Sequence, residues 1–364
     1  MRVRAALVAA PGDPFTIRDV DLAAPGEHEV LVRVTAVGIC HTDLLYRRMW
    51  PRARTPVVLG HEGTGTVEAV GAQVTRVRPG ETVCMSYRNC GACDTCRAGH
   101  PAYCDSAGPL NLSGGRADGT SPLSAGGAPV YGSFFGQSSF ATHALAHENN
   151  TVPVPATLPA RVAAPLGCSV QTGAGAVCNV LRPHPGEPLA IFGAGGVGLS
   201  ALMAAQAIGC DTIVAVDPLR TRRELAVALG ARAAIDPGSG EEVPAAVRRA
   251  AGGTLGYAID TTGRQDAIGN AVAALRPMGS LVLAGLGGTA ELDVSRIVTR
   301  GISVRGTVEG DATPADFIPR MVELYRAGRL PVERIVTEFA FDRIEAAAQA
   351  ATAGQVVKPV LRMA

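Results

Sequence analysis

The segment Leu189-Ala190-Ile191-Phe192-Gly193-Ala194-Gly195-Gly196-Val197-Gly198 decides which fold we expect for this chain. Its four apolar residues predict a buried strand, and its glycines fit the pattern G-x-G-x-x-G where a helix over 197–208 is expected to begin. Asp217 lies nineteen residues beyond Gly198, at the end of the next expected strand. In this context the glycines predict a tight turn whose backbone approaches a pyrophosphate at the helix N-terminus.

Asp217 and the arginines that follow it bear on the choice of dinucleotide. The carboxylate would accept hydrogen bonds from a ribose 2′-OH and repel a 2′-phosphate, which favours NAD over NADP. Arg220, Arg222 and Arg223 follow closely, and an arginine can accommodate a 2′-phosphate, so NADP stays open as the alternative. We expect NAD, with Asp217 and Arg222 among its contacts.

Strands and helices alternate after this segment. Further strands are expected at 212–216, 233–235, 257–260 and 281–284, with a helix at 222–229 that Gly230 ends. Such alternation implies a Rossmann-type, doubly wound parallel sheet with helices on both faces.

The N-terminal part of the chain has a different sequence pattern. Short β-branched runs such as 30–37 and 63–70 are separated by turns and predict mostly antiparallel strands. The Gly-, Ser- and Pro-rich stretch 105–135 predicts a long loop. After residue 305 two helices, 315–327 and 343–353, and a strand, 356–361, are expected. We therefore expect an α/β protein with a mostly β catalytic domain (1–165 and 305–364) and a dinucleotide-binding domain (166–304).

Composition excludes several classes of function. The 364 residues carry 33 Lys plus Arg against 32 Asp plus Glu, so no basic surface for nucleic acid or anionic membrane is expected. The two charge-free stretches, 162–181 and 188–210, are rich in turn residues and do not resemble membrane spans. No signal peptide is apparent at the N-terminus, and a cytoplasmic location is expected.

Four of the nine cysteines are clustered as Cys-x2-Cys-x2-Cys-x7-Cys at Cys90, Cys93, Cys96 and Cys104. Four thiolates this close can surround a tetrahedral Zn²⁺ and leave no position open, which is typical of a structural zinc site. A [4Fe–4S] cluster also takes four thiolates, but the last spacing differs from the ferredoxin run. Disulfides are the other alternative, and a reducing cytosol disfavours them.

Three further residues, Cys40, His61 and Cys168, are unremarkable one by one, because a lone cysteine or histidine is most often a core residue. Together with their surroundings, the chain resembles the zinc-dependent medium-chain alcohol dehydrogenases from end to end, with a GroES-like catalytic domain. The matching motifs are Gly38-Ile39-Cys40-His41-Thr42-Asp43, Gly60-His61-Glu62-Gly63-Thr64-Gly65, the four-cysteine loop and Gly193–Gly198. The local amino-acid sequences at 138–142 and 148–152 are most similar to those of the benzyl (aryl) alcohol dehydrogenases.

The resemblance implies a catalytic zinc held by Cys40, His61 and Cys168. Two cysteines and one histidine are the known zinc ligands of alcohol dehydrogenases, and the set is carried over from the family. With the four-cysteine site this makes two Zn²⁺ per chain. The resemblance further implies roles for Asp43 beside His61, for Glu62 as an outer ligand, and for Thr42 as the proton acceptor. It places the following residues at the cofactor: His41, Thr172, Val197, Leu286 and Lys358.

The same resemblance implies an NAD-dependent enzyme that interconverts a primary, aromatic or allylic alcohol and its aldehyde. A thiol-adduct formaldehyde dehydrogenase is the alternative enzyme, and a catalytically inactive cofactor-binding relative is the alternative of another class. Candidates for the substrate pocket are Met49, Trp50, Leu110, Leu286 and the region of Phe134 and Phe135. Leu45 stands where well-known members carry a proton-relaying histidine, so another proton route is expected, with His41 as the candidate catalytic substitute.

Assembly is expected through the β-branched segment 302–306. In this family dimers form by joining the edge strands of two cofactor-domain sheets, and an exposed strand of this kind pairs readily. We expect a homodimer, with a homotetramer as the alternative, and small-molecule alcohols or aldehydes as the other partners.

Overall fold

The computed structural model describes residues 1–363, which form two compact units. The first contains Met1–Cys168, Thr313–Val322 and the residues from Glu333 onward; the second contains Ser169–Ala312 and Glu323–Val332. Residues 305–312 and 323–332, assigned to the catalytic domain from sequence, thus lie in the second unit. For the first of these segments the reason is that residues 309–311 pack against the helix that follows Cys168, where Gln171 donates a hydrogen bond to Glu309 at 3.1 Å.

The second unit is built on a six-stranded parallel sheet in the order β13-β12-β11-β14-β15-β16, which confirms the expected doubly wound sheet. The strands are β11 Leu189–Phe192, β12 Ile213–Val216, β13 Ala233–Ile235, β14 Tyr257–Asp260, β15 Ser280–Leu283 and β16 Ser303–Gly306. The helices are α5 Ser169–Gly175, a π-helix Ala176–Leu181, α6 Gly196–Ala207, α7 Arg220–Ala228, α8 Val243–Ala250, α9 Gln265–Ala274, α10 Val294–Arg300 and the 3-10 turn η6 Glu309–Asp311.

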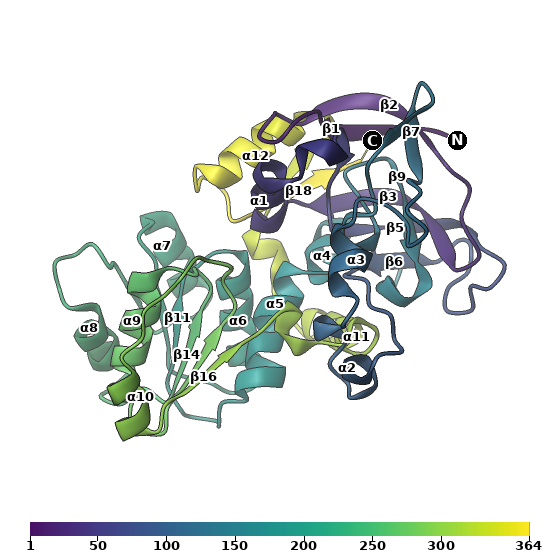
Figure 1. Cartoon of the computed structure of the whole chain (residues 1–364). Helices are drawn as coiled ribbons and strands as arrows, with labels where there is room; N and C mark the ends of the chain where they lie inside the picture. The colour runs from purple at the N-terminus through teal and green to yellow at the C-terminus, as the bar shows by residue number, and fades with distance from the viewer. Residues whose placement is uncertain (364) are drawn as a thin grey trace. The chain divides into compact units, whose positions relative to one another are not determined.

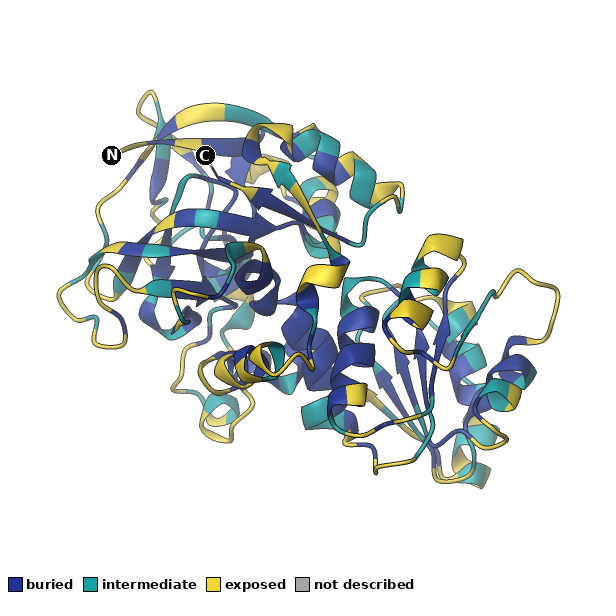
Figure 2. Ribbon diagram, turned by 180° about the vertical axis from the view of Figure 1, so that it is seen from behind, coloured by how far each residue is buried: buried dark blue, intermediate teal, exposed yellow. Residues whose placement is uncertain are grey.

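The central strands of this sheet are apolar, and both faces of the sheet are covered there. The strands β11 and β12 are buried at every position, as a parallel sheet covered on both sides requires. Figure 2 shows them in the buried colour. Helices α8 and α9 lie on one face of the sheet, and α5 and α6 on the other (Figure 1).

The first unit contains two β-sheets. One has the order β4-β1-β2-β7-β8, and the other the order β10-β6-β5-β3-β18-β17 with β9 also paired to β3. The strands are β1 Arg2–Val8, β2 Thr16–Leu22, β3 Glu29–Gly38, β4 Val57–Val58, β5 Glu62–Val70, β6 Thr82–Met85, β7 Leu123–Ala125, β8 Ala128–Val130, β9 His143–His147, β10 Thr151–Pro153, β17 Val336–Ala340 and β18 Lys358–Arg362. All pairs are antiparallel except β17 with β18. The C-terminal β18, yellow in Figure 1, lies beside β3 from the start of the chain.

Short helices connect these strands. They are α1 His41–Met49, α2 Asp94–Arg97, α3 Ala107–Leu112, α4 Ala160–Leu166 and α12 Ile344–Thr352, with 3-10 turns at Arg52–Arg54, Pro101–Tyr103, Phe134–Gly136, Glu148–Asn150, Val332–Ile335 and Phe341–Arg343. Helix α11, Pro314–Arg326, has residues in both units. Within residues 1–363, no helix combines the length and the apolar character that a membrane span needs.

The stretch 105–135 is more ordered than the long loop expected from sequence. It contains α3 and the hairpin β7–β8, and β7 extends the first sheet by pairing with β2. A three-residue strand is too short to leave a periodic pattern in the sequence, which explains why it was missed.

Candidate functional site

Four side chains converge in the first unit. Cys40 precedes α1, His61 precedes β5, Glu62 begins β5, and Cys168 follows α4. One potential ligand atom of each lies within 4.8 Å of all the others. His61 is 1% exposed, and its Nε2 is buried without a hydrogen-bond partner. Because a buried ring nitrogen is rarely left unpaired, this atom indicates that the cluster accommodates a further group.

Asp43 fixes the orientation of His61. Its Oδ1 lies 2.8 Å from His61 Nδ1 and also accepts the Gly60 N–H at 3.1 Å, while Oδ2 accepts the Cys40 N–H at 2.9 Å. Since a carboxylate only accepts hydrogen bonds, Nδ1 carries a proton, and in the neutral form of the ring, the form that can bind a metal, the lone pair lies on Nε2. The chain passes closely here: a Cβ at Gly60, where φ is +93°, would lie 2.4 Å from the Phe140 nitrogen.

Gln137 is a supporting residue that the sequence analysis missed. It is 2% exposed, and its amide donates to the carbonyls of His61 at 2.9 Å and Ser86 at 3.0 Å. Its Oε1 accepts from Gly63 N–H at 3.1 Å and from Ser139 at 2.9 Å. Gln137 directly precedes the Ser-Ser-Phe texture, but a single glutamine carries no recognisable sequence signal.

Cys168 is positioned by a tight packing of the residue before it. A Cβ at Gly167 would lie 2.0 Å from the Met85 carbonyl oxygen, so only glycine fits there. The Ser86 hydroxyl donates to the Gly167 carbonyl at 2.6 Å. The end of α4 is thereby held against β6.

The electrostatics of the cluster favour a thiolate. A hydrogen bond from Cys168 and the positive charge of Lys358 hold the pKa of Cys40 well below its usual value, although burial opposes this. Burial disfavours a charged His61, yet the Asp43 carboxylate beside it keeps its pKa well above the usual value. Thr42, whose hydroxyl lies 3.8 Å from the Cys40 sulfur, completes this side of the site.

Lys358 has a different environment from the one expected for a cofactor contact. It is 3% exposed, and its ammonium lies 3.0 Å from both Glu62 oxygens and 3.2 Å from the Ile39 carbonyl. Burial alone would lower the pKa of Lys358, but the Glu62 carboxylate reverses this and raises it. In this structure Lys358 balances Glu62, and its contact with cofactor phosphates stays a prediction.

The four clustered cysteines form a second group of converging ligand atoms. Cys90, Cys93, Cys96 and Cys104 each have a sulfur within 4.8 Å of the other three. Backbone N–H groups of Ala92 and Cys93 donate to the Cys90 sulfur, at 3.4 and 3.3 Å, and lower its pKa to about 6. Cys96 N–H donates to Cys93, and Ser106 N–H to Cys104, both at 3.4 Å. Such N–H donors stabilise metal-bound thiolates.

The glycine-rich turn in the second unit leaves room for a ligand. Gly193 has φ of +93°, and a Cβ at Gly198 would lie 1.8 Å from the Gly193 carbonyl oxygen. At Gly195, before α6, the only heavy atom within 4 Å of an added Cβ is a nitrogen of Arg222 at 3.9 Å. The turn is therefore tight on its inner side and open at Gly195.

Asp217 directly follows β12 and is 2% exposed. It accepts hydrogen bonds from Ala194 N–H and Leu219 N–H, both at 2.8 Å, and Arg222 lies 3.9 Å from it. The carboxylate is therefore tied to the glycine-rich turn. Thr172 is buried in α5, Val197 is half-buried, His41 is exposed and Leu286 is 64% exposed.

Trp50 is buried in the first unit, and its place in the substrate pocket stays a prediction. It is 2% exposed, donates from Nε1 to the Arg54 carbonyl at 2.7 Å, and packs against Tyr46 and Phe134. Met49, in contrast, is 66% exposed at the end of α1, and Leu110 is half-buried in α3. Trp50 directly follows α1 as its C-cap, with an extended backbone, so its side chain does not continue the face of the helix.

Two phenylalanines pack on the imidazole of His61. The Phe135 ring stacks on it with centroids 4.6 Å apart and an interplanar angle of 29°, and Phe134 meets it edge-on at 5.5 Å. Phe135 adopts a left-handed backbone with φ of +52°, which is unusual for a bulky residue. The cluster of candidate metal ligands thus has an aromatic wall.

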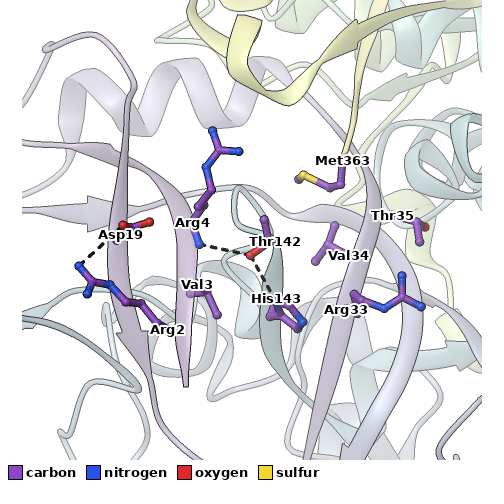
Figure 3. Close-up of a pocket in the computed structure, with 10 residues that line it drawn as sticks. All are labelled: Arg2, Val3, Arg4, Asp19, Arg33, Val34, Thr35, Thr142, His143 and Met363. Carbon is purple, nitrogen blue, oxygen red and sulfur yellow. Dashed lines mark hydrogen bonds and ion pairs between the residues drawn. The ribbon is translucent and has the colours of Figure 1, made fainter.

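A separate hollow of about 380 Å³ lies elsewhere in the first unit. Figure 3 shows its lining, in which Arg2 pairs with Asp19 at 3.7 Å and the Arg4 N–H donates to Thr142 at 3.3 Å. None of its lining residues belongs to the predicted metal or cofactor sets.

Comparisons with known proteins agree on one kind of protein. Residues 26–156 match the family model described as an alcohol dehydrogenase GroES-like domain, and residues 196–326 match that of a zinc-binding dehydrogenase. A geraniol dehydrogenase of Castellaniella defragrans is 45% identical over 362 residues, covering 98% of this chain and 97% of the relative.

Solved structures agree as well. The crystal structure of an alcohol dehydrogenase zinc-binding domain protein from Burkholderia ambifaria is 44% identical, with a TM-score of 0.97 and coverage of 100% of this chain and 99% of that one. The structure of benzyl alcohol dehydrogenase from Acinetobacter calcoaceticus is 40% identical, with a TM-score of 0.95 and full coverage of both chains.

Proposed function

The chain belongs to the zinc-dependent medium-chain alcohol dehydrogenase family, and from this premise we propose that it oxidises primary aromatic or allylic alcohols to aldehydes with NAD. The reaction takes an alcohol and NAD⁺ and yields the aldehyde, NADH and a proton. The observation that carries the proposal is the convergence of Cys40, His61 and Cys168 around an unpaired, buried His61 Nε2.

The described residues fit two zinc ions and one dinucleotide. Cys40, His61 and Cys168 would hold a catalytic zinc with one position open, and the four cysteines of the 90–104 loop would hold a structural zinc with none open. The room at Gly195 and the buried Asp217 would receive the pyrophosphate and the ribose of NAD. When bound, zinc supplies a Lewis acid that lowers the pKa of an alcohol, and NAD⁺ accepts the hydride.

The chain's own groups prepare this chemistry. Asp43 keeps the proton of His61 on Nδ1, so that Nε2 offers its lone pair to the metal. Thr42 follows Cys40 by two residues, and its hydroxyl would accept the alcohol proton. Lys358 neutralises Glu62, so the buried carboxylate adds no uncompensated charge beside the metal.

The aromatic wall supports the proposed substrate class. The half-buried Phe135 places ring surface beside His61, and the fully buried Phe134 packs behind it. Flat, unsaturated substituents pack well against such rings. The relatives named for geraniol and benzyl alcohol point to the same class.

A thiol-adduct formaldehyde dehydrogenase needs free charges for the carboxylates of the thiol. Arg116 is bonded to Glu29 at 2.7 and 2.8 Å, and Asp118 accepts hydrogen bonds from Thr120. These charges are engaged within the 105–135 stretch and its neighbours, which gives this alternative no support.

A substrate panel tests the proposal. We expect the purified enzyme with NAD⁺ to oxidise benzyl, cinnamyl and geranyl alcohols with kcat/KM at least about 100-fold above that for ethanol, since the buried aromatic surface contributes about 3 kcal/mol. Equal rates for ethanol would contradict the substrate class. Turnover of formaldehyde only in the presence of a thiol would favour the alternative enzyme.

A further inference from the structure

The segment Glu309-Gly310-Asp311 has an uncommon backbone. All three residues have positive φ, at +51°, +65° and +50°. Glycine adopts this conformation freely, but two of the three are carboxylate residues, for which it is unfavourable. Residues are kept in such conformations where the surrounding structure requires them, often at functional sites.

The Glu309 side chain explains why the surrounding structure requires this turn. It is 6% exposed, and one oxygen, Oε2, accepts from the Gln171 amide at 3.1 Å and from the Thr172 hydroxyl at 3.4 Å. Both donors lie at the start of α5 and are themselves buried. The carboxylate therefore joins two adjacent side chains of α5 through a single acceptor atom.

The turn is also locked against the far end of α5. A Cβ on Gly175 would lie 2.5 Å from the Gly310 carbonyl oxygen, and Asn179 donates to that oxygen at 3.1 Å from the π-helix 176–181. π-Helical turns are rare and occur frequently at functional sites. The contacts with Gln171, Thr172 and Asn179 thus hold η6 along the whole of α5 and its extension.

We propose that Glu309 is a positioning residue of the cofactor site, which orients the Thr172 hydroxyl and the Gln171 amide for the nicotinamide end of NAD. The inference rests on the proposed function and on the family resemblance, which places Thr172 at the cofactor and implies that it contacts the nicotinamide. It assigns to the Glu309 carboxylate the task of holding Thr172 in one rotamer before the cofactor arrives. The unfavourable backbone at 309–311 is the consequence of bringing that carboxylate to α5.

Replacement of Glu309 by glycine separates positioning from stability. Glu309→Gly removes the carboxylate but relaxes the backbone, so we expect Tm to stay near the wild-type value. The Kd for NADH should rise about tenfold, as expected for loss of hydrogen bonds to a charged group. The deuterium isotope effect on kcat with α-deuterated cinnamyl alcohol should increase, because a misplaced nicotinamide slows hydride transfer. Glu309→Gln keeps an acceptor oxygen and should restore the Kd to within about threefold of wild type.

Asp311→Gly is the matched control. It relaxes the same turn, but Asp311 is paired with Arg305 at 3.1 Å, and we expect its NADH affinity and isotope effect to match wild type. The inference is overturned if Glu309→Gly binds NADH as wild type does, or if Asp311→Gly shows the same loss. A wild-type enzyme that neither binds NADH nor oxidises the alcohol panel would instead contradict the proposed function, so the two failures are distinguishable.

Discussion

Cys168 is the side chain on which the proposed catalytic zinc can be tested most simply. Without its sulfur, Cys40 and His61 would hold the metal poorly, and we expect Cys168→Ala to lower kcat by more than about 100-fold, beyond the loss typical of outer-shell changes. Zinc analysis should fall from two ions per chain to one, while Tm changes little. An active variant with full metal content would contradict the ligand assignment.

Asp217 tests the choice of cofactor. Its carboxylate already accepts one backbone hydrogen bond from Ala194, in the turn that would hold the pyrophosphate, and another from Leu219 before α7. Asp217→Ser removes the charge, and we expect kcat/KM for NAD to fall by about 10–100-fold, the value of hydrogen bonds to a charged group, while that for NADP rises. Equal efficiency of the wild-type enzyme with both cofactors would mean that Arg222 outweighs the carboxylate.

At the scale of elements, the junction between β9 and the 3-10 turn 148–150 is expected to make the stability of the fold depend on pH. Burial, with the nearby Arg88, lowers the pKa of His147 from 6.5 to about 4. The unfolded chain therefore binds more protons between these values, and the stability that the neutral ring provides is lost as pH falls from 6.5 towards 4. Glu148, whose pKa is lowered by its bonds to Thr75 and His28 despite partial burial, acts in the same direction at lower pH.

Urea unfolding at pH 7 and pH 5 measures this effect. The midpoint should fall further for the wild-type protein than for His147→Gln, whose side chain can still accept the Asn149 N–H that His147 Nδ1 accepts at 3.2 Å. If the urea midpoint fell by the same amount between pH 7 and pH 5 in both proteins, His147 would not titrate in this range.

We expect the 90–104 loop to depend on a bound metal for its fold. Its regular structure is limited to the short α2 and a 3-10 turn. Its four cysteine sulfur atoms lie close enough together to bind one metal ion. We expect Cys93→Ala to lower Tm by about 5 °C or more, because metal binding and folding of such a loop are coupled. A variant of unchanged Tm and one zinc per chain would refute a structural role.

Most elements of the cofactor-binding unit were predictable from sequence, because buried parallel strands and the helices between them leave long periodic signals. The ligand cluster was not predictable from spacing, since Cys40, His61 and Cys168 are brought together only by β3, β5 and α4; the family resemblance supplied it. The burial of Trp50 could not be foreseen, because an aromatic residue beside an exposed Met49 gives no sign of it. Gln137 and the Glu309 turn depend on contacts across more than seventy residues, which no local pattern records.

At the scale of the whole molecule, β16 is the strand at one edge of the parallel sheet. Exposed apolar residues lie near it, with Val298 at 72% and Val308 at 48% exposure. We expect two chains to pair through this edge, with a two-fold axis between the sheets. Light scattering should show a dimer, and Val304→Lys should shift it towards monomer. A wild-type monomer at micromolar concentration would contradict edge pairing, whereas a tetramer would require a second interface.

The central claim is that an alcohol dehydrogenase zinc lies among Cys40, His61 and Cys168. The most direct measurement is anomalous diffraction at the zinc edge from crystals of enzyme that oxidises cinnamyl alcohol with NAD⁺. We predict two zinc peaks per chain, one bonded to the sulfurs of Cys40 and Cys168 and to His61 Nε2, the other to the four sulfurs of the 90–104 loop. Active crystals that lack the peak at His61 would contradict the claim.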